Sequence, residues 1–146
     1  FRPSSEWQFH RAAYQANKSI NALVHTHANY ATILACAGKE IPPFHYMIAT
    51  AGRDVIPLVP YAIFGSKQLS DGVKISMTGG KACLLAHHGQ LAGEGTLAKA
   101  MELAEIVEDL AHQFWALLQL GDVKLLSKSE MKAVHQKFKT YGQQNI

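Results

Sequence analysis

Residues 20–27 read Ile-Asn-Ala-Leu-Val-His-Thr-His, an apolar run that is closed by two histidines one residue apart, His25 and His27. Successive side chains of a strand point to opposite faces, so residues i and i+2 share a face and can hold one ion between them. Imidazole is a frequent zinc ligand, and three protein ligands with one open position are typical of a catalytic zinc site. The stretch therefore predicts a strand that ends at a metal site.

A second apolar run farther along the chain ends in a His-His-Gly triplet, whose histidines are His87 and His88. If a strand continues through the triplet, the two side chains point to opposite faces, so only one of them can join the first pair. Periodicity does not say which one. Glu6 lies in the first turn of an expected helix and has three possible roles: fourth ligand, general base, or a glutamate that only favours the helix N-terminus.

Signals for helices and strands alternate along the chain, which predicts a layered α/β domain. Helices are expected over residues 5–16, 30–37, 66–77, 96–120 and 129–140. The periodicity is clearest over residues 96–120, where an apolar stripe is formed by Leu103, Val107, Leu110, Phe114 and Leu117. Strands or extended pieces are expected over residues 20–25, 44–49, 55–61, 82–86 and 90–92. Four prolines in the middle of the chain argue against helices there. Ser5 and Gln8 have the spacing of a capping box for the first helix.

Composition limits the class of protein. A chain of 146 residues with 48% hydrophobic residues has the size and core of one domain. The net charge of +3 without a clustered basic face argues against nucleic-acid binding. The two cysteines, Cys36 and Cys83, lie in apolar segments, so the sequence suggests neither a disulfide framework nor a cysteine metal cluster and favours the cytoplasm. No signal peptide or bilayer-spanning apolar run is visible, so we expect a soluble protein without membrane contact.

Six short motifs follow one another over nearly the whole chain. They are PSSEW at 3–7, VHTHA at 24–28, FHYMI at 44–48, PYAIFG at 60–65, LAHHG at 85–89 and KFKTYG at 137–142. In this set and order the chain resembles the class II, zinc-dependent sugar-phosphate aldolases. The resemblance implies a three-layer α/β/α fold with a central mixed, largely antiparallel sheet.

The resemblance also implies the metal site. It places the zinc ligands at His25, His27 and His88, with one Zn²⁺ per subunit. The glutamate after the paired serines matches Glu6, which in the family binds the resting metal and acts as the base when substrate arrives. Three neutral imidazoles leave the charge of the ion unbalanced, so that it can polarise a ketone.

Further residues match the family's substrate groups. Ser4 and Ser5 match the serines that help to hold the substrate phosphate. Tyr46 matches a proton donor that works in the active site of the neighbouring subunit, since the family is a homotetramer with sites between subunits. Tyr141, as a further catalytic aromatic, and Phe64 match residues on the aldehyde side of the substrate.

The implied reaction is the cleavage of a ketose 1-phosphate, with L-fuculose 1-phosphate as the expected substrate. The products are dihydroxyacetone phosphate and L-lactaldehyde, formed through a zinc-stabilised enediolate. L-ribulose-5-phosphate 4-epimerase and methylthioribulose-phosphate dehydratase are alternatives on the same fold. The epimerase carries an aspartate at the position of Glu6 and a further catalytic aspartate in the region of residues 44–49, where this chain has none. A metal-free cytoskeletal relative is the non-enzymatic alternative, and it predicts that the metal ligands are lost.

The family's subunit begins well before its paired serines, with a glycine- and asparagine-containing loop that completes the phosphate pocket. Residues 1–146 are therefore expected to be a class II aldolase domain without that N-terminal segment. We expect this chain alone to be weakly active or inactive.

Overall fold

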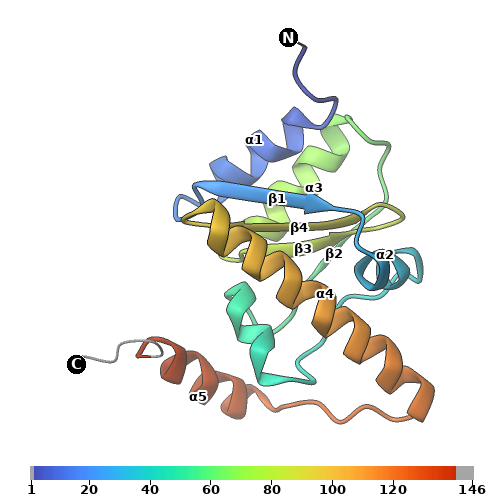
Figure 1. Cartoon of the computed structure of the whole chain (residues 1–146), viewed down its shortest axis with the longest axis vertical. Coiled ribbons are helices and arrows are strands. Elements are labelled where there is room, and N and C mark those ends of the chain that lie inside the picture. Colours follow the sequence, from blue (N-terminus) through green and yellow to red (C-terminus); the bar gives the residue numbers. More distant parts are fainter. Residues whose placement is uncertain (1, 141–146) are drawn as a thin grey trace.

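The computed structural model describes residues 2–140, in which a four-stranded sheet has helices on both faces (Figure 1). The strands are β1 (Ala22–Thr26), β2 (Leu58–Val59), β3 (Ala82–Leu85) and β4 (Gly89–Glu94). The helices are α1 (Trp7–Ala16), α2 (Asn29–Cys36), α3 (Lys67–Met77), α4 (Leu97–Leu120) and α5 (Lys128–Phe138), together with the 3₁₀ helix η1 (Tyr46–Ala51). This arrangement confirms the expected three-layer α/β/α fold.

The sheet has the strand order β1-β4-β3-β2. Strand β4 runs antiparallel to both β1 and β3, whereas β2 runs parallel to β3, so the sheet is mixed and largely antiparallel, as expected. Thr26 at the end of β1 pairs with Gln90 near the start of β4. The end of β1 and the loop that joins β3 to β4 therefore meet at the same end of the sheet.

Two hydrophobic cores lie on opposite faces of the sheet. Helices α1 and α3 cover one face, where Phe9, Ala13 and Val73 are buried. Helices α2 and α4 cover the other face, where Leu34 and Val107 are buried. Successive side chains of β3 enter the two cores in turn, so all four residues of this strand are buried, which explains why it reads as a continuous apolar run.

Helix α4 confirms the clearest periodic segment of the sequence. Leu103, Val107, Leu110 and Phe114 of the expected stripe are all buried in the core on this face of the sheet. Each such side chain contributes about 1.5–3 kcal/mol when it is removed from water. The Thr96 side chain accepts a hydrogen bond from the backbone N–H of Lys99 and so caps the helix.

The segment 44–49 was expected to be extended, and this expectation is wrong, because η1 covers most of it. The His45 ring accepts a hydrogen bond from the Met47 N–H, which stabilises a tight first turn. Gly52 then ends the helix with a left-handed φ of 76°. The expected extended piece at 55–61 does contain the edge strand β2.

The first helix also begins differently from the expectation. The predicted capping box between Ser5 and Gln8 is not among the hydrogen bonds of the described residues. Instead, the Ser4 hydroxyl accepts a hydrogen bond from the Glu6 N–H, and Glu6 itself is the N-cap residue of α1. This shift places the Glu6 carboxylate just before the first turn, beside the end of β1.

The two cysteines are both free, as the sequence predicted; Cys36 is exposed and Cys83 is buried. Burial raises the pKa of the Cys83 thiol to about 12, so this thiol stays protonated and acts as a small apolar group. Among residues 2–140, every helix is too short or too polar to cross a bilayer.

Candidate metal centre

Three histidines gather at the end of the sheet where β1 stops. His25 lies in β1, His27 follows the strand directly, and His88 lies in the loop between β3 and β4. Their ring centroids are 5.0 Å (His25 to His27), 4.8 Å (His25 to His88) and 5.0 Å (His27 to His88) apart. One nitrogen of each ring lies within 4.8 Å of the others, so the set can hold a metal ion.

The hairpin between β3 and β4 decides which histidine of the His-His-Gly triplet joins the site. Strand β3 ends at Leu85 and β4 begins at Gly89, so the strand does not continue through the triplet. His87 adopts a left-handed φ of 56° in the loop and is exposed, whereas His88 turns toward His25. The alternation of side-chain directions along a strand therefore could not have shown that His88, and not His87, joins the site.

The protonation state of His25 suits a metal ligand. Its Nδ1 lies 2.8 Å from the carbonyl oxygen of Gln90, which is an acceptor, so Nδ1 carries the hydrogen and Nε2 carries the lone pair. Burial lowers the pKa of His25, an effect that the Gln90 hydrogen bond and the Glu6 charge only partly offset. The ring is thus neutral near pH 7, and its free lone pair faces the cluster.

Glu6 completes the cluster from α1. Its carboxylate lies 2.9 Å from His88 Nε2 and 3.3 Å from His25 Nε2, and its side chain is only 18% exposed. The His25 Nε2 atom is buried and forms no hydrogen bond within residues 2–140. A lone pair and a carboxylate that face each other at this distance repel unless a cation lies between them, so the donor set fits a divalent metal ion.

An open cleft of about 430 Å³ lies beside the cluster. It is lined by Glu6, His27, Tyr61, Ala62, Phe64, His87 and His88. Phe64 was expected at the substrate site and does line this cleft. Tyr61, whose ring meets that of His87 edge-on at 5.7 Å, was not singled out, although it lies inside a quoted motif.

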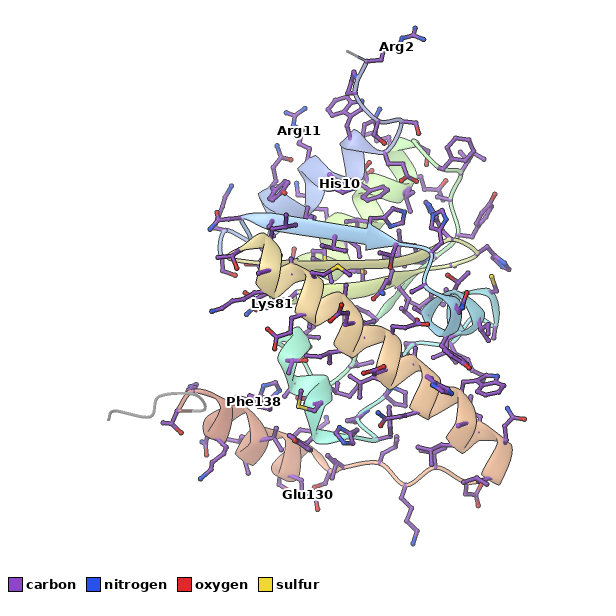
Figure 2. The ribbon with its side chains drawn as sticks, viewed as in Figure 1. Arg2, His10, Arg11, Lys81, Glu130 and Phe138 are labelled. Atoms are coloured by element: carbon purple, nitrogen blue, oxygen red, sulfur yellow. The ribbon has the colours of Figure 1, made fainter. Side chains whose placement is uncertain are left out.

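The other predicted residues lie in different places. Ser4 and Ser5 are exposed just before α1, next to Glu6. Tyr46 is half exposed on η1 and stacks on Phe138 of α5, with ring centroids 6.2 Å apart. Figure 2 shows Phe138 at the end of the molecule opposite His10 of α1, so Tyr46 does not meet the three histidines within one chain.

Tyr141, the remaining expected aromatic residue, lies outside the described residues. The roles that the resemblance assigns to all these side chains stay predictions. What the geometry adds is a shared location for Glu6, Phe64 and the histidine cluster at one cleft.

Comparison with known proteins supports the same family. The family model described as Class II Aldolase and Adducin N-terminal domain matches residues 1–115. A 5-methylthioribulose-1-phosphate/5-deoxyribulose-1-phosphate aldolase of Rhodospirillum rubrum is 49% identical over 141 residues, which cover 97% of this chain and 64% of that protein. An L-fuculose phosphate aldolase of Escherichia coli strain K12 is 48% identical over 141 residues, which cover 96% of this chain and 66% of that protein.

A solved structure of an L-fuculose 1-phosphate aldolase has the same fold. It superimposes with a TM-score of 0.89 at 40% sequence identity, and the match covers 94% of this chain and 64% of that one. The chain therefore spans somewhat less than two thirds of the length of that structure and of the Rhodospirillum rubrum protein. With the family model matched over residues 1–115, this chain belongs to the class II aldolase and adducin N-terminal domain family.

Proposed function

We propose that the protein is a zinc-dependent aldolase that cleaves a ketose 1-phosphate to dihydroxyacetone phosphate and an aldehyde. The observation that carries this proposal is the convergence of His25, His27 and His88 with the Glu6 carboxylate at one open cleft. A non-catalytic member of the family has no need for such a set. Two relatives at 48% and 49% identity are named as aldolases of sugar phosphates.

The three histidines would hold the metal. Nδ1 of His25 is committed to the Gln90 carbonyl, so this ring would bind through Nε2. A divalent ion supplies a Lewis acid that polarises the ketone of the substrate and makes the adjacent carbon acidic. Because imidazoles are neutral ligands, they leave the positive charge available for this purpose.

Glu6 would move the proton at the carbon next to the ketone. In the condensation direction its carboxylate accepts the proton, and in the cleavage direction it returns the proton to the same carbon. Its place at the N-cap of α1 and its contacts with His25 and His88 hold the carboxylate at the cleft.

The exposed hydroxyls of Ser4 and Ser5, at the N-terminal end of the ten-residue helix α1, would help to bind the phosphate. Hydroxyls and free backbone N–H groups at such a position bind anions without a lysine or arginine. Phe64 would line the aldehyde side of the cleft.

Tyr46 would donate a proton to the aldehyde oxygen in a neighbouring subunit of a homotetramer. Its half-exposed position on η1, away from its own histidine cluster, is compatible with that role. The tetramer, the cytoplasmic location and the contribution of Tyr141 are predictions of the same proposal.

The identity of the substrate has two candidates. L-fuculose 1-phosphate is the first, in agreement with the name of the Escherichia coli relative. A 5-substituted ribulose 1-phosphate is the second, because the Rhodospirillum rubrum relative is named for 5-methylthioribulose 1-phosphate and 5-deoxyribulose 1-phosphate. Both candidates have an apolar end, which the Tyr61 and Phe64 side of the cleft can contact.

A product analysis tests the proposal. The full-length protein is loaded with Zn²⁺ and incubated with both sugar phosphates, and dihydroxyacetone phosphate is measured by enzymatic reduction. We expect release of dihydroxyacetone phosphate from at least one of the two substrates, and none after His27→Ala. Isomerised or dehydrated products without dihydroxyacetone phosphate would favour an epimerase or a dehydratase instead.

A further inference from the structure

The N-terminus of α2 is capped from a distant part of the chain. The Glu108 carboxylate of α4 accepts hydrogen bonds from the backbone N–H groups of Tyr30 and Ala31, each at 2.8 Å. These are the groups that an N-cap side chain normally satisfies. The N-cap residue of α2 is Ala28, which has no polar side chain, so Glu108 takes over this function.

A second contact connects the end of β1, just before α2, to the same helix α4. The Gln90 side chain is buried, and its amide nitrogen donates to the Thr26 hydroxyl at 3.0 Å and to the Ala104 carbonyl oxygen of α4 at 3.1 Å. The backbone carbonyl of Gln90 accepts the hydrogen bond from His25 Nδ1. Gln90 therefore connects β1, β4 and α4 at one point.

The two contacts lie on either side of His27 in the segment 25–30, which is called here the metal-binding corner. Ala104 and Glu108 are four residues apart on α4 and so lie on one face of that helix. On the other side, the attached groups are the side-chain hydroxyl of Thr26 and the backbone N–H of Tyr30, and His27 lies between these two residues. His27 is exposed, so the anchored residues on each side of it help to determine where its ring lies.

We propose that Glu108 and Gln90 are positioning residues of the metal centre, which hold the His25–His27 corner against α4 so that its two imidazoles meet His88. This inference rests on the proposed function, because it assumes that the three histidines bind a metal. Glu108 acts through the backbone of α2, and Gln90 acts through Thr26 and through the ring of His25.

The consequence is a specific sensitivity of metal binding to residues that do not touch the metal. Glu108→Gln keeps the shape of the side chain but replaces one acceptor oxygen with an N–H₂ group, so one backbone N–H loses its partner. Changes in groups that orient metal ligands weaken metal affinity by about 10- to 100-fold. We expect a loss at the lower end of this range, about tenfold, because the effect passes through the backbone.

The test measures Zn²⁺ affinity by competition with a chromophoric chelator, and the visible spectrum of the Co²⁺-substituted full chain. Glu108→Gln is expected to weaken Zn²⁺ binding about tenfold and to shift the Co²⁺ bands. Glu105→Gln is the matched control, because Glu105 is an exposed glutamate on the same helix, and it should change neither readout.

A second variant separates positioning from stability. Adding Ala28→Ser to Glu108→Gln supplies a local hydroxyl that can cap α2, so it should restore the melting temperature. It cannot restore the link to α4, so the affinity should stay weak and the Co²⁺ bands shifted. If affinity and spectrum return together with the melting temperature, Glu108 only stabilises the helix and the proposal is wrong. Ala28→Ser alone serves as the reference.

The outcomes also separate this inference from the proposed function. If the unmodified protein binds no Zn²⁺, the proposed function fails. If it binds Zn²⁺ and Glu108→Gln binds equally well with the same Co²⁺ spectrum, only the positioning role fails. Should Glu108→Gln not fold, Gln90→Met carries the test, since it keeps the backbone carbonyl and removes only the side-chain amide. It should weaken Zn²⁺ binding, and an unchanged affinity would overturn the proposal.

Discussion

Gly89 lies so close to Thr26 that a Cβ atom on Gly89 would be 2.3 Å from the Thr26 carbonyl oxygen. The same Cβ would be 3.1 Å from the His27 ring. Strand β1 and the start of β4 can approach this closely only because residue 89 has no side chain. The glycine of the His-His-Gly triplet therefore helps to bring His88 to the two histidines at the end of β1.

The first prediction concerns this glycine. Gly89→Ala should destabilise the fold by about 1–3 kcal/mol, because a backbone oxygen cannot move aside as a flexible side chain can. It should also weaken metal binding, since His27 must shift. Gly95→Ala is the control: its new Cβ would meet its nearest neighbour, the Ser19 carbonyl oxygen, at 3.9 Å. Equal chemical denaturation curves for the two variants would contradict this account.

The second prediction separates the base from the ligands. Glu6→Gln should leave Zn²⁺ bound, because the three histidines remain, and should slow the reaction by about 10²- to 10⁴-fold, the usual contribution of a general base. The measurement is the exchange of the hydrogen next to the ketone of dihydroxyacetone phosphate in D₂O. Exchange at the unmodified rate would remove Glu6 from the role of base.

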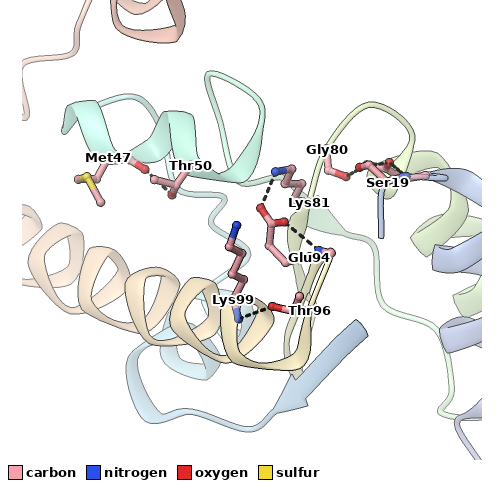
Figure 3. A network of polar contacts seen from close by, with 10 residues as sticks. Ser19, Met47, Thr50, Gly80, Lys81, Glu94, Thr96 and Lys99 are labelled. Carbon is pink, nitrogen blue, oxygen red and sulfur yellow. Dashed lines mark hydrogen bonds and ion pairs between the residues drawn. The ribbon is translucent and has the colours of Figure 1, made fainter. Parts of the chain in front are cut away.

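The third prediction concerns the pH dependence of the ion pair between Lys81 and Glu94 (Figure 3). This pair lies at the open end of the β3–β4 hairpin, away from the loop that carries His88. Burial alone would raise the pKa of Glu94, but the hydrogen bonds from Lys81 and the Gly95 N–H outweigh it, so the pKa is lowered. A carboxylate with a lowered pKa in the folded state contributes stability above its unfolded pKa of about 4.3. That contribution is lost as the pH falls through the lower folded value.

Lys81→Met should therefore cost about 1 kcal/mol at pH 7 and much less once the pH has fallen below the lowered pKa of Glu94 in the folded state. The measurement is the free energy of unfolding as a function of pH. Lys67→Met is the control, because the Lys67–Asp71 pair is far more exposed and should contribute only a few tenths of a kcal/mol, about 0.3–0.5. A loss that does not depend on pH would show that Lys81 acts through packing alone.

The fourth prediction addresses a site shared between subunits. Tyr46→Phe should bind Zn²⁺ normally and lose most of its activity, whereas His88→Ala should lose the metal. If Tyr46 acts in a neighbouring subunit, mixed oligomers of the two inactive variants contain some sites with both residues intact. Activity should therefore reappear after joint refolding. No recovery in oligomers shown to be mixed would contradict a role of Tyr46 in the site of a neighbouring subunit.

The sequence predicted the elements whose signals are local. The stripe of Leu103, Val107 and Leu110 predicted α4, and the apolar run before His25 predicted β1. The boundaries of β1 shifted by a residue or two because pairing with β4, and not apolar character, sets where a strand ends. The segment 44–49 was misread because the side-chain hydrogen bond at His45 stabilises a turn that prolines were expected to prevent.

The parts of the site that depend on tertiary contacts could not be predicted from local pattern. The choice of His88 over His87 follows from the register of the β3–β4 hairpin and from the left-handed backbone at His87. The cap that Glu108 provides for α2 joins residues far apart in the sequence, and Ala28 has no capping side chain that would signal it. Gln90 looked like one polar residue in a short strand.

The measurement that tests the central claim most directly is the metal content of the purified protein, together with that of His25→Ala, His27→Ala and His88→Ala. Elemental analysis should find about one zinc ion per chain in the unmodified protein and a large loss in each variant, while circular dichroism shows that the variants remain folded. A folded, unmodified protein that takes up no divalent metal, or a His88→Ala variant that retains it fully, would contradict the account.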